Sequence, residues 1–250
     1  RADNFCNFNK NAEKEVILIG DSHTEVLSYS LLSKLKKINY KFITINRADC
    51  IYLPNFEKRY LKDNKEYKNC TLDSKNKIDE LIFSKKDSII IIGGNFKKHF
   101  FTKAEWKYIS KDNLDPHESF KNSLNKLIKN NKVILIYPIP SSKFDVTKRI
   151  MNEVPKNTFN ATKYLNKNQF TNDYQYYLDE NKFILSFLES LNHKNLYKVF
   201  PDKIFCDKIT KKKCFTHEGK DIFYSDTNHL SLIGAEKLTS KIISTIENIN

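Results

Sequence analysis

The 250-residue chain is predicted to adopt an α/β fold, a three-layer sandwich in which a central parallel sheet of about five strands is flanked by helices. Two observations predict it. Short apolar runs of strand length alternate along the chain with stretches whose apolar residues recur at helical spacing. No run approaches the roughly 20 apolar residues of a membrane helix. With 40% hydrophobic residues, the composition is that of an ordinary globular protein.

Five apolar runs are interpreted as the strands of the sheet. Each is short and is followed by turn-forming or polar residues, which favours a buried strand over a buried helix. In chain order the runs are 16–19, 41–45, 88–92, 133–137 and 196–200.

Helices are predicted between and after these strands, at 24–37, 78–83, 115–129, 183–191 and 231–246. The predicted helix 115–129 has the clearest N-terminal signal. Asp115 can cap the helix, Pro116 suits the first turn, and Glu118 can reach back to the cap. Ser231 is the predicted cap of the last helix. The polar stretch 138–170 is irregular and is interpreted as a long surface excursion near the site.

One domain is expected over residues 14–250, preceded by a linker or extension at 1–13. Because the chain opens on Arg1 and carries no visible signal peptide, it is interpreted as a fragment or processed form. On this interpretation a targeting segment or a larger neighbour has been removed.

The formal net charge of +13 does not by itself indicate nucleic-acid binding. The lysines are scattered along the chain, as expected of solvated faces, and the one three-lysine run, 211–213, is better explained as a solvated loop than as a phosphate clamp. No nucleic-acid partner is therefore expected. A basic surface can still attract an anionic glycan or lipid headgroup.

Five cysteines indicate an oxidising compartment. Cys50 and Cys70 bracket one polar segment and Cys206 and Cys214 bracket a basic loop, so two local disulfides are expected, with Cys6 left over. No Cys-x-x-Cys occurs and histidines do not cluster near the cysteines, so neither a metal site nor a cofactor is expected. The alternative is five reduced thiols in a cytosolic protein.

The first candidate for chemistry is Ser22, in the motif Gly20-Asp21-Ser22-His23 directly after the strand 16–19. In an open parallel sheet, ligands bind outside the carboxyl ends of the strands. A serine there stands at a helix N-terminus, whose unpaired N–H groups favour a developing oxyanion. The alternative is a simple helix cap.

The partner motif is Asp226-x-x-His229, just before the last predicted helix. One turn can present both side chains to the same pocket, so that the carboxylate orients the imidazole while His229 takes the proton of Ser22. The alternative for His229 alone is a structural histidine before a helix.

The strand 88–92 ends in Gly93-Gly94-Asn95. An asparagine at the carboxyl end of a strand can aim its side-chain amide at the oxyanion. The alternative is a glycine turn with a solvated asparagine.

These three motifs resemble blocks one, five and three of the SGNH (GDSL-like) hydrolase superfamily. The resemblance is closer to the SGNH domains attached to acyltransferase-3 membrane proteins, which O-acetylate bacterial surface glycans. The features that indicate it are His23 after the serine, Cys50 after the second strand, the pair Cys206 and Cys214, and the run His229-Leu230-Ser231-x-x-Gly234-Ala235.

The resemblance implies catalytic roles for Ser22, Asp226 and His229, and oxyanion or substrate-binding roles for Asn95, Gly94, Ala48 and His23. Two departures stand out. The superfamily's second-block glycine is absent, because Asn46-Arg47-Ala48-Asp49 occupies its place, so any donor there must be a backbone N–H. Phe96 stands where an aspartate often follows the asparagine.

The implied function is an O-acyltransferase, in the first instance an O-acetyltransferase, that acts through Ser22 on a hydroxyl of lipopolysaccharide, peptidoglycan or another envelope glycan. Two alternatives stay open: a carbohydrate esterase or lipase-like hydrolase, and a non-catalytic glycan-binding module. By resemblance, a membrane domain of the same full-length chain would deliver the acyl donor. The domain would then be periplasmic or otherwise extracytoplasmic and tethered to the inner membrane.

Overall fold

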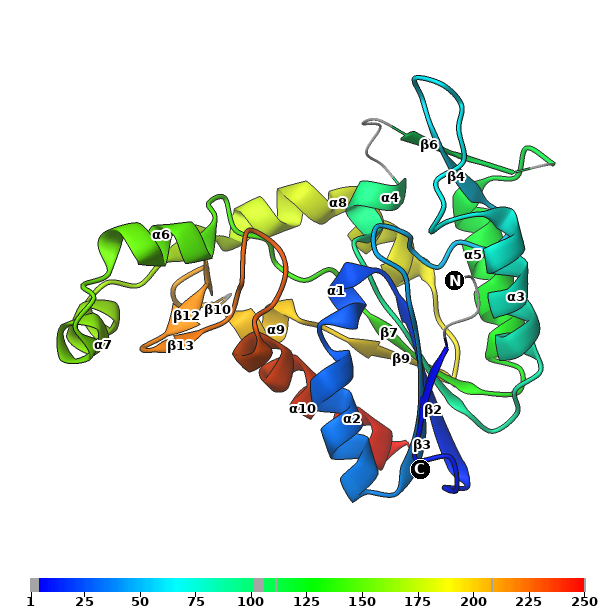
Figure 1. Cartoon of the computed structure of the whole chain (residues 1–250), viewed down its shortest axis with the longest axis horizontal. Coiled ribbons are helices and arrows are strands. Elements are labelled where there is room, and N and C mark those ends of the chain that lie inside the picture. Colours follow the sequence, from blue (N-terminus) through cyan, green and yellow to red (C-terminus); the bar gives the residue numbers. More distant parts are fainter. Residues whose placement is uncertain (1–4, 101–105, 111, 208, 250) are drawn as a thin grey trace.

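The computed structural model describes residues 5–100, 106–110, 112–207 and 209–249 and has a six-stranded sheet between two layers of helices (Figure 1). The strand order is β1-β3-β2-β5-β7-β9, with β1 antiparallel to β3 and all other neighbours parallel. The bounds are β1 Cys6–Phe8, β2 Lys14–Gly20, β3 Tyr40–Asn46, β5 Ile89–Ile92, β7 Lys132–Ile136 and β9 Leu196–Val199. The predicted α/β class with about five parallel strands is confirmed, and residues 6–8 add an antiparallel edge strand.

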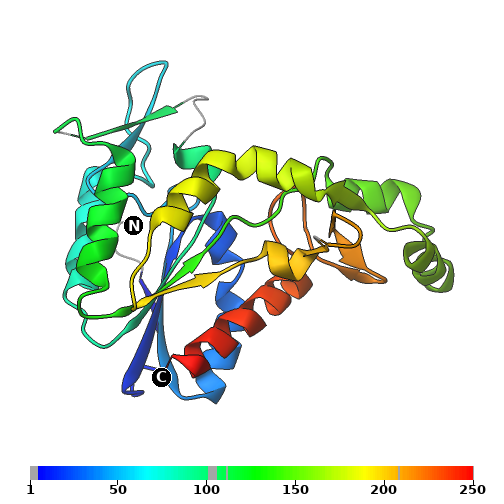
Figure 2. The ribbon, with the colours of Figure 1, turned by 180° about the vertical axis from the view of Figure 1, so that it is seen from behind.

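The central strands are buried on both faces, which is why they appear in the sequence as continuous apolar runs. In β2, Ile17 and Ile19 contribute to one core, while Val16 and Leu18 contribute to the other. The first core is covered by α3 (Leu72–Phe83), α5 (Pro116–Leu127) and α8 (Tyr174–Ser190). The second is covered by α2 (Ser28–Lys37) and α10 (Leu232–Asn248), on the opposite side of the sheet (Figure 2).

Three predicted helices differ in extent from the observed ones. The predicted helix 24–37 is two helices, α1 (Ser22–Glu25) and α2. The first starts at Ser22 itself, because the Asp21 side chain caps it there. Helix α3 begins at Leu72 behind a Thr71 cap, and α8 begins at Tyr174. Both extend further toward the N-terminus than predicted, because their first turns are rich in polar or tyrosine residues that hide the apolar period.

The sequence pattern predicts that the excursion 138–170 is irregular. This prediction is wrong, because the segment contains two helices. These are α6 (Val146–Glu153) and α7 (Thr158–Lys167), which extend away from the sheet as an arm (Figures 1 and 2). Polar N-caps start both helices, at Asp145 and Asn157. Both helices are short and amphipathic, with Val146 and Leu165 buried, so a helical period was present in the sequence but stands among many polar residues.

The remaining elements are short and surround the carboxyl end of the sheet. They are α4 (Phe96–Phe100), α9 (Asp202–Phe205), the pair β4 (Glu57–Tyr60) and β6 (Trp106–Ile109), the sheet of β10 (Cys206–Asp207), β11 (Lys213–Phe215) and β8 (Thr171–Asp173), and the pair β12 (His217–Glu218) and β13 (Asp221–Ile222). In the part of the chain that the structure describes, no helix has the length and apolar character needed to span a membrane.

The structure contains the two disulfides that the sequence analysis expects, Cys50–Cys70 and Cys206–Cys214, and leaves Cys6 free and exposed. The first follows the turn after β3. The second joins the paired strands β10 and β11.

Gly234 seats α10 against the strand end that precedes the Asp226–His229 turn. A Cβ built on it would lie 2.2 Å from the Phe223 carbonyl oxygen, which is backbone and cannot rotate away. We therefore predict that Gly234→Ala lowers the free energy of unfolding by about 1–3 kcal/mol, the usual cost of overpacking. Urea unfolding measures it, with Lys241→Ala on the exposed face of α10 as the control. Equal stability of the two variants would contradict the prediction.

Candidate active site

Three loops meet at the carboxyl ends of neighbouring parallel strands. Ser22 follows β2, the turn 47–49 follows β3, and Asn95 follows β5. The Arg47 amide donates to the Gly20 carbonyl (3.0 Å), which joins the first two loops at their base. The strand order β3-β2-β5 therefore puts Ser22 between the other two loops, as expected for this edge of a parallel sheet.

Ser22, His229 and Asp226 form a continuous chain of contacts although 207 positions separate the serine from the histidine. Ser22 Oγ lies 2.8 Å from His229 Nε2, and His229 Nδ1 lies 2.7 Å from Asp226 Oδ2. The carboxylate only accepts, so Nδ1 carries the hydrogen of a neutral ring and Nε2 has a free lone pair. That lone pair can accept the Ser22 proton.

The turn that carries Asp226 and His229 is held from two sides. Inside it, Asp226 Oδ1 accepts from the amides of Asn228 and His229, both at 2.7 Å. From outside, the excursion supports it: the Ser142 amide donates to the Thr227 carbonyl (2.7 Å). The expected position of the excursion near the site is thus observed, with a contact to this turn.

Asp226 remains a carboxylate at any pH near neutrality. Partial burial acts to raise its pKa, but the hydrogen bonds from the His229 and Asn228 amides and from the His229 ring outweigh burial and hold the pKa below its usual value. An ionised Asp226 is the form that orients the imidazole.

Asp21, to which the sequence analysis gave no role, connects two loops of the site. Its Oδ1 accepts from the His23 amide and its Oδ2 from the Asn95 amide, both at 2.8 Å, and its side chain is fully buried. Burial acts to raise its pKa. The contact with His99, the field of His23 and the Asn95 amide together outweigh burial and lower the pKa to about 2. Its position as a polar residue between a strand and a helix start is the one sequence signal for a capping role.

His99 and Tyr108 lie behind Asp21 and were not anticipated. His99 Nε2 is 3.4 Å from Asp21 Oδ2, an electrostatic contact rather than a well-formed hydrogen bond. Its Nδ1 is 2.7 Å from the Tyr108 hydroxyl. Burial lowers the His99 pKa, so the ring is neutral at neutral pH.

The side-chain amide of Asn95 is oriented by contacts at both its oxygen and its nitrogen. Its Oδ1 accepts from the Lys98 amide (3.2 Å), and its Nδ2 lies 3.4 Å from His23 Nε2. One amide hydrogen thus faces His23, and the second is available to a ligand. The His23 ring meets the His229 ring edge-on with centroids 5.0 Å apart, so His23 links Asn95 to the Ser22 partner.

The two remaining candidates, Gly94 and Ala48, have different surroundings. Gly94 adopts φ +143°, and a Cβ on it would lie 3.2 Å from the Asp21 carboxyl group, so a side chain there would push against the buried carboxylate. Ala48 is exposed in the turn after β3. Within the described residues, the amides of Ala48 and Asp49 have no hydrogen-bond partner.

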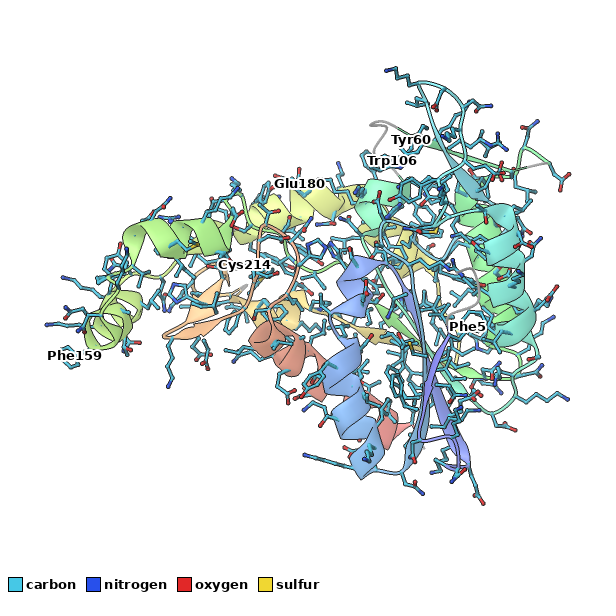
Figure 3. The ribbon with its side chains drawn as sticks, viewed as in Figure 1. Phe5, Tyr60, Trp106, Phe159, Glu180 and Cys214 are labelled. Carbon is cyan, nitrogen blue, oxygen red and sulfur yellow. A yellow bond between two sulfur atoms is a disulfide. The ribbon has the colours of Figure 1, made fainter. Side chains whose placement is uncertain are left out.

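A cavity of about 370 Å³ opens beside His23 and Asn95. Glu180 of α8 (Figure 3), which forms an ion pair with Lys97, is among the lining residues. Other lining residues come from the excursion, from α8 and from the Asp226–His229 turn: Ser141, Ser142, Tyr176, Thr227 and Asn228. Hydroxyl, amide and charged groups predominate, which suits a polar ligand with several hydroxyls. No group of three or more His, Cys, Asp or Glu side chains in the described ranges could hold a metal ion.

The chain is similar to a known family in sequence and to known proteins in fold. The family model described as "SGNH domain (fused to AT3 domains)" matches residues 1–244. The periplasmic domain of the lipopolysaccharide acetyltransferase of Salmonella ser. Paratyphi A has the same fold, with a TM-score of 0.58 and 15% identity over 93% of this chain and 84% of that chain. A salicylyl-acyltransferase from a tetracycline biosynthetic pathway gives a TM-score of 0.41 and 10% identity over 95% of this chain and 55% of that chain. No curated protein sequence matches.

The buried His23 predicts a specific acid sensitivity. Burial, the largest influence, lowers its pKa from 6.5 to about 4, so between these values the unfolded chain binds a proton that the folded chain does not. Stability should therefore fall as the pH drops from about 6.5 to about 4, by at most about 1.4 kcal/mol per pH unit from this residue.

In His23→Gln, which retains an amide but does not titrate, the loss of stability between pH 7 and pH 5 should be smaller than in the unmodified protein. Urea unfolding at both pH values measures it. An equal loss in both proteins would show that His23 is not the group that takes up the proton.

Proposed function

This chain belongs to the family of SGNH domains that are fused to AT3 domains, and we propose that it transfers an acyl group, in the first instance acetyl, through Ser22 to a hydroxyl of a bacterial cell-envelope glycan. Family membership supports an acyl-transferring or hydrolytic enzyme. The observation that carries the proposed mechanism is the unbroken contact from Ser22 Oγ through His229 to Asp226.

In the proposed first half-reaction, Ser22 Oγ attacks the acyl carbon of the donor while its proton passes to His229 Nε2. Asp226 stabilises the imidazolium that forms. The tetrahedral oxyanion is held by the free amide hydrogen of Asn95 and by backbone N–H groups of the loops around it. The bond to the leaving group then breaks, the leaving group takes the proton from His229, and an acyl ester on Ser22 remains.

In the second half-reaction, a glycan hydroxyl attacks the Ser22 ester and gives its proton to His229 Nε2. Collapse of the second tetrahedral intermediate releases the acylated glycan and returns the proton to Ser22. The cavity lined by Tyr176 and Glu180 is the proposed acceptor site, because its polar lining can bond several hydroxyls. Water in place of the acceptor gives ester hydrolysis, so hydrolysis of a small ester reports the first half-reaction.

The proposed setting is extracytoplasmic. Two disulfides fit an oxidising compartment. The fusion of this family to AT3 domains supports a membrane domain in the same full-length chain as the source of the acyl donor and as the tether to the inner membrane.

We predict that Ser22→Ala lowers turnover on p-nitrophenyl acetate by about 10⁴-fold or more, and that His229→Ala is nearly as severe, because such residues act as a unit. In cells that make the full-length protein, Ser22→Ala should remove acyl groups from the envelope glycan, as read by mass spectrometry. Ser240→Ala, exposed on α10, is the matched control. Ester hydrolysis that survives in Ser22→Ala would refute the assignment of the nucleophile.

Asn95 offers a second prediction, because its donor and its acceptor can be separated. Asn95→Asp retains the oxygen that accepts from the Lys98 amide, whereas Asn95→Ala removes donor and acceptor together. Both variants should lower kcat by about 10²–10³-fold, because both remove the N–H that would face the oxyanion. If Asn95→Asp turned over at the rate of the unmodified protein, Asn95 would serve only to cap α4.

A further inference from the structure

Lys58 is a charged side chain that the proposed mechanism does not use, although it is fully buried near the site. Its ammonium lies 4.2 Å from the centre of the Tyr67 ring and 3.8 Å from that of Trp106. Trp106 is paired with Tyr60 across the β4–β6 ladder (Figure 3). A buried ammonium is costly unless it is paired, so its partner indicates why it is retained.

The partner of Lys58 is Asp49. Lys58 Nζ donates to the main-chain carbonyl of Asp49 at 2.9 Å and to Asp49 Oδ2 at 2.7 Å. A second ammonium, that of Lys98, donates to Asp49 Oδ1 at 2.6 Å. The side chain and the main chain of one residue are thus held by two lysines, one of which comes from α4.

Asp49 has a backbone conformation that is uncommon outside glycine. Its φ is +57°, in the left-handed region that glycine adopts freely, that costs most other L-residues about 1–2 kcal/mol, and that aspartate enters more readily than most. It ends the turn 47–49 beside Gly20, whose carbonyl accepts from the Arg47 amide, and the amides of Ala48 and Asp49 have no partner among the described residues. The Cys50–Cys70 disulfide anchors the next residue, and the Cys70 carbonyl accepts from the Lys58 amide at 2.9 Å.

We propose that Lys58 is a positioning residue, which holds Asp49 in the left-handed conformation and thereby fixes the turn whose free amides serve as the second donor to the oxyanion. The proposal rests on the proposed function, and it assigns to a buried lysine the task that a glycine would perform without help. Tyr67 and Trp106 exclude water from the ammonium, which strengthens its attraction to Asp49.

The decisive variant is Lys58→Met, which keeps an unbranched apolar side chain between the two rings but removes the charge. In this variant the turn 47–49 would no longer be held in place. We expect kcat on p-nitrophenyl acetate to fall by about 10- to 100-fold with little change in KM, because a misplacement of about 1 Å at a reacting centre has effects of this size. Lys62→Met, exposed just beyond β4, is the matched control and should not change kcat.

A second substitution, Asp49→Gly, can show whether Lys58→Met acts by displacing the turn or by lowering the stability of the whole protein. Glycine at position 49 adopts a positive φ without a clamp. The double variant Lys58→Met/Asp49→Gly should therefore have a kcat within about 3-fold of Asp49→Gly alone, although the charge is still absent and the unfolding temperature still reduced. If Lys58→Met lowers kcat as much in the Asp49→Gly background as in the unmodified protein, the proposal is overturned.

A measurement without substrate distinguishes failure of this inference from failure of the proposed function. The HN–Hα coupling and the Cα chemical shift of Asp49, read by NMR in the unmodified protein and in Lys58→Met, report φ at this residue. The expected result is a left-handed signature that is lost in Lys58→Met and retained in Lys62→Met. An unchanged signature in Lys58→Met overturns the inference whether or not the protein hydrolyses esters. A changed signature in a protein without Ser22-dependent hydrolysis supports the clamp and refutes the proposed function alone.

Discussion

The geometry of the candidate site depends on one buried carboxylate. Asp21 accepts hydrogen bonds from the amides of His23 and Asn95, and so joins the loop after β2 to the loop after β5. Gly94 leaves the space that this contact requires. Because Asp21 is ionised at all ordinary pH values and excluded from water, both bonds are charge-assisted in a low-dielectric interior, where such bonds are strongest. The relation between the Ser22 helix and the Asn95 loop is therefore fixed before any substrate binds.

Much of this architecture could be predicted from the sequence, for a physical reason. Strands buried on both faces must be apolar throughout, which locates β2, β5 and β7 in the sequence within a few residues. β3 and β9 are only partly buried, and their β-branched and aromatic residues indicate them instead. Parallel strands then bring their carboxyl ends to one edge, and the residues that follow them must lie near one another. For the same reason Ser22 and Asn95 could be expected at a common site although the chain separates them widely.

Contacts that depend on long-range packing could not be predicted. Lys58, His99 and Tyr108 lie in short elements that carry no recognisable motif, and only the folded chain brings them behind the site. The helices of the arm do carry an amphipathic period, but each is short and mostly polar, which makes it resemble a surface loop in the sequence. The sequence shows only that the turn at Asp49 lacks a glycine. That an aspartate adopts the glycine conformation there, held by two lysines, follows only from the packing.

Two aspartates of the site differ in burial, and this difference separates their roles. Asp21 is excluded from water, and both of its carboxylate oxygens accept from main-chain amides. It therefore holds the backbone in place and is not positioned to stabilise a charge that develops near Ser22. Asp226 is partly exposed, and one of its oxygens faces the His229 ring. In the proposed mechanism, a proton moves between Ser22 and His229, and Asp226 can respond to the charge on the ring while Asp21 keeps the surrounding loops in place. A carboxylate with the surroundings of Asp21 would serve poorly beside His229, because its hydrogen bonds are already committed to the backbone.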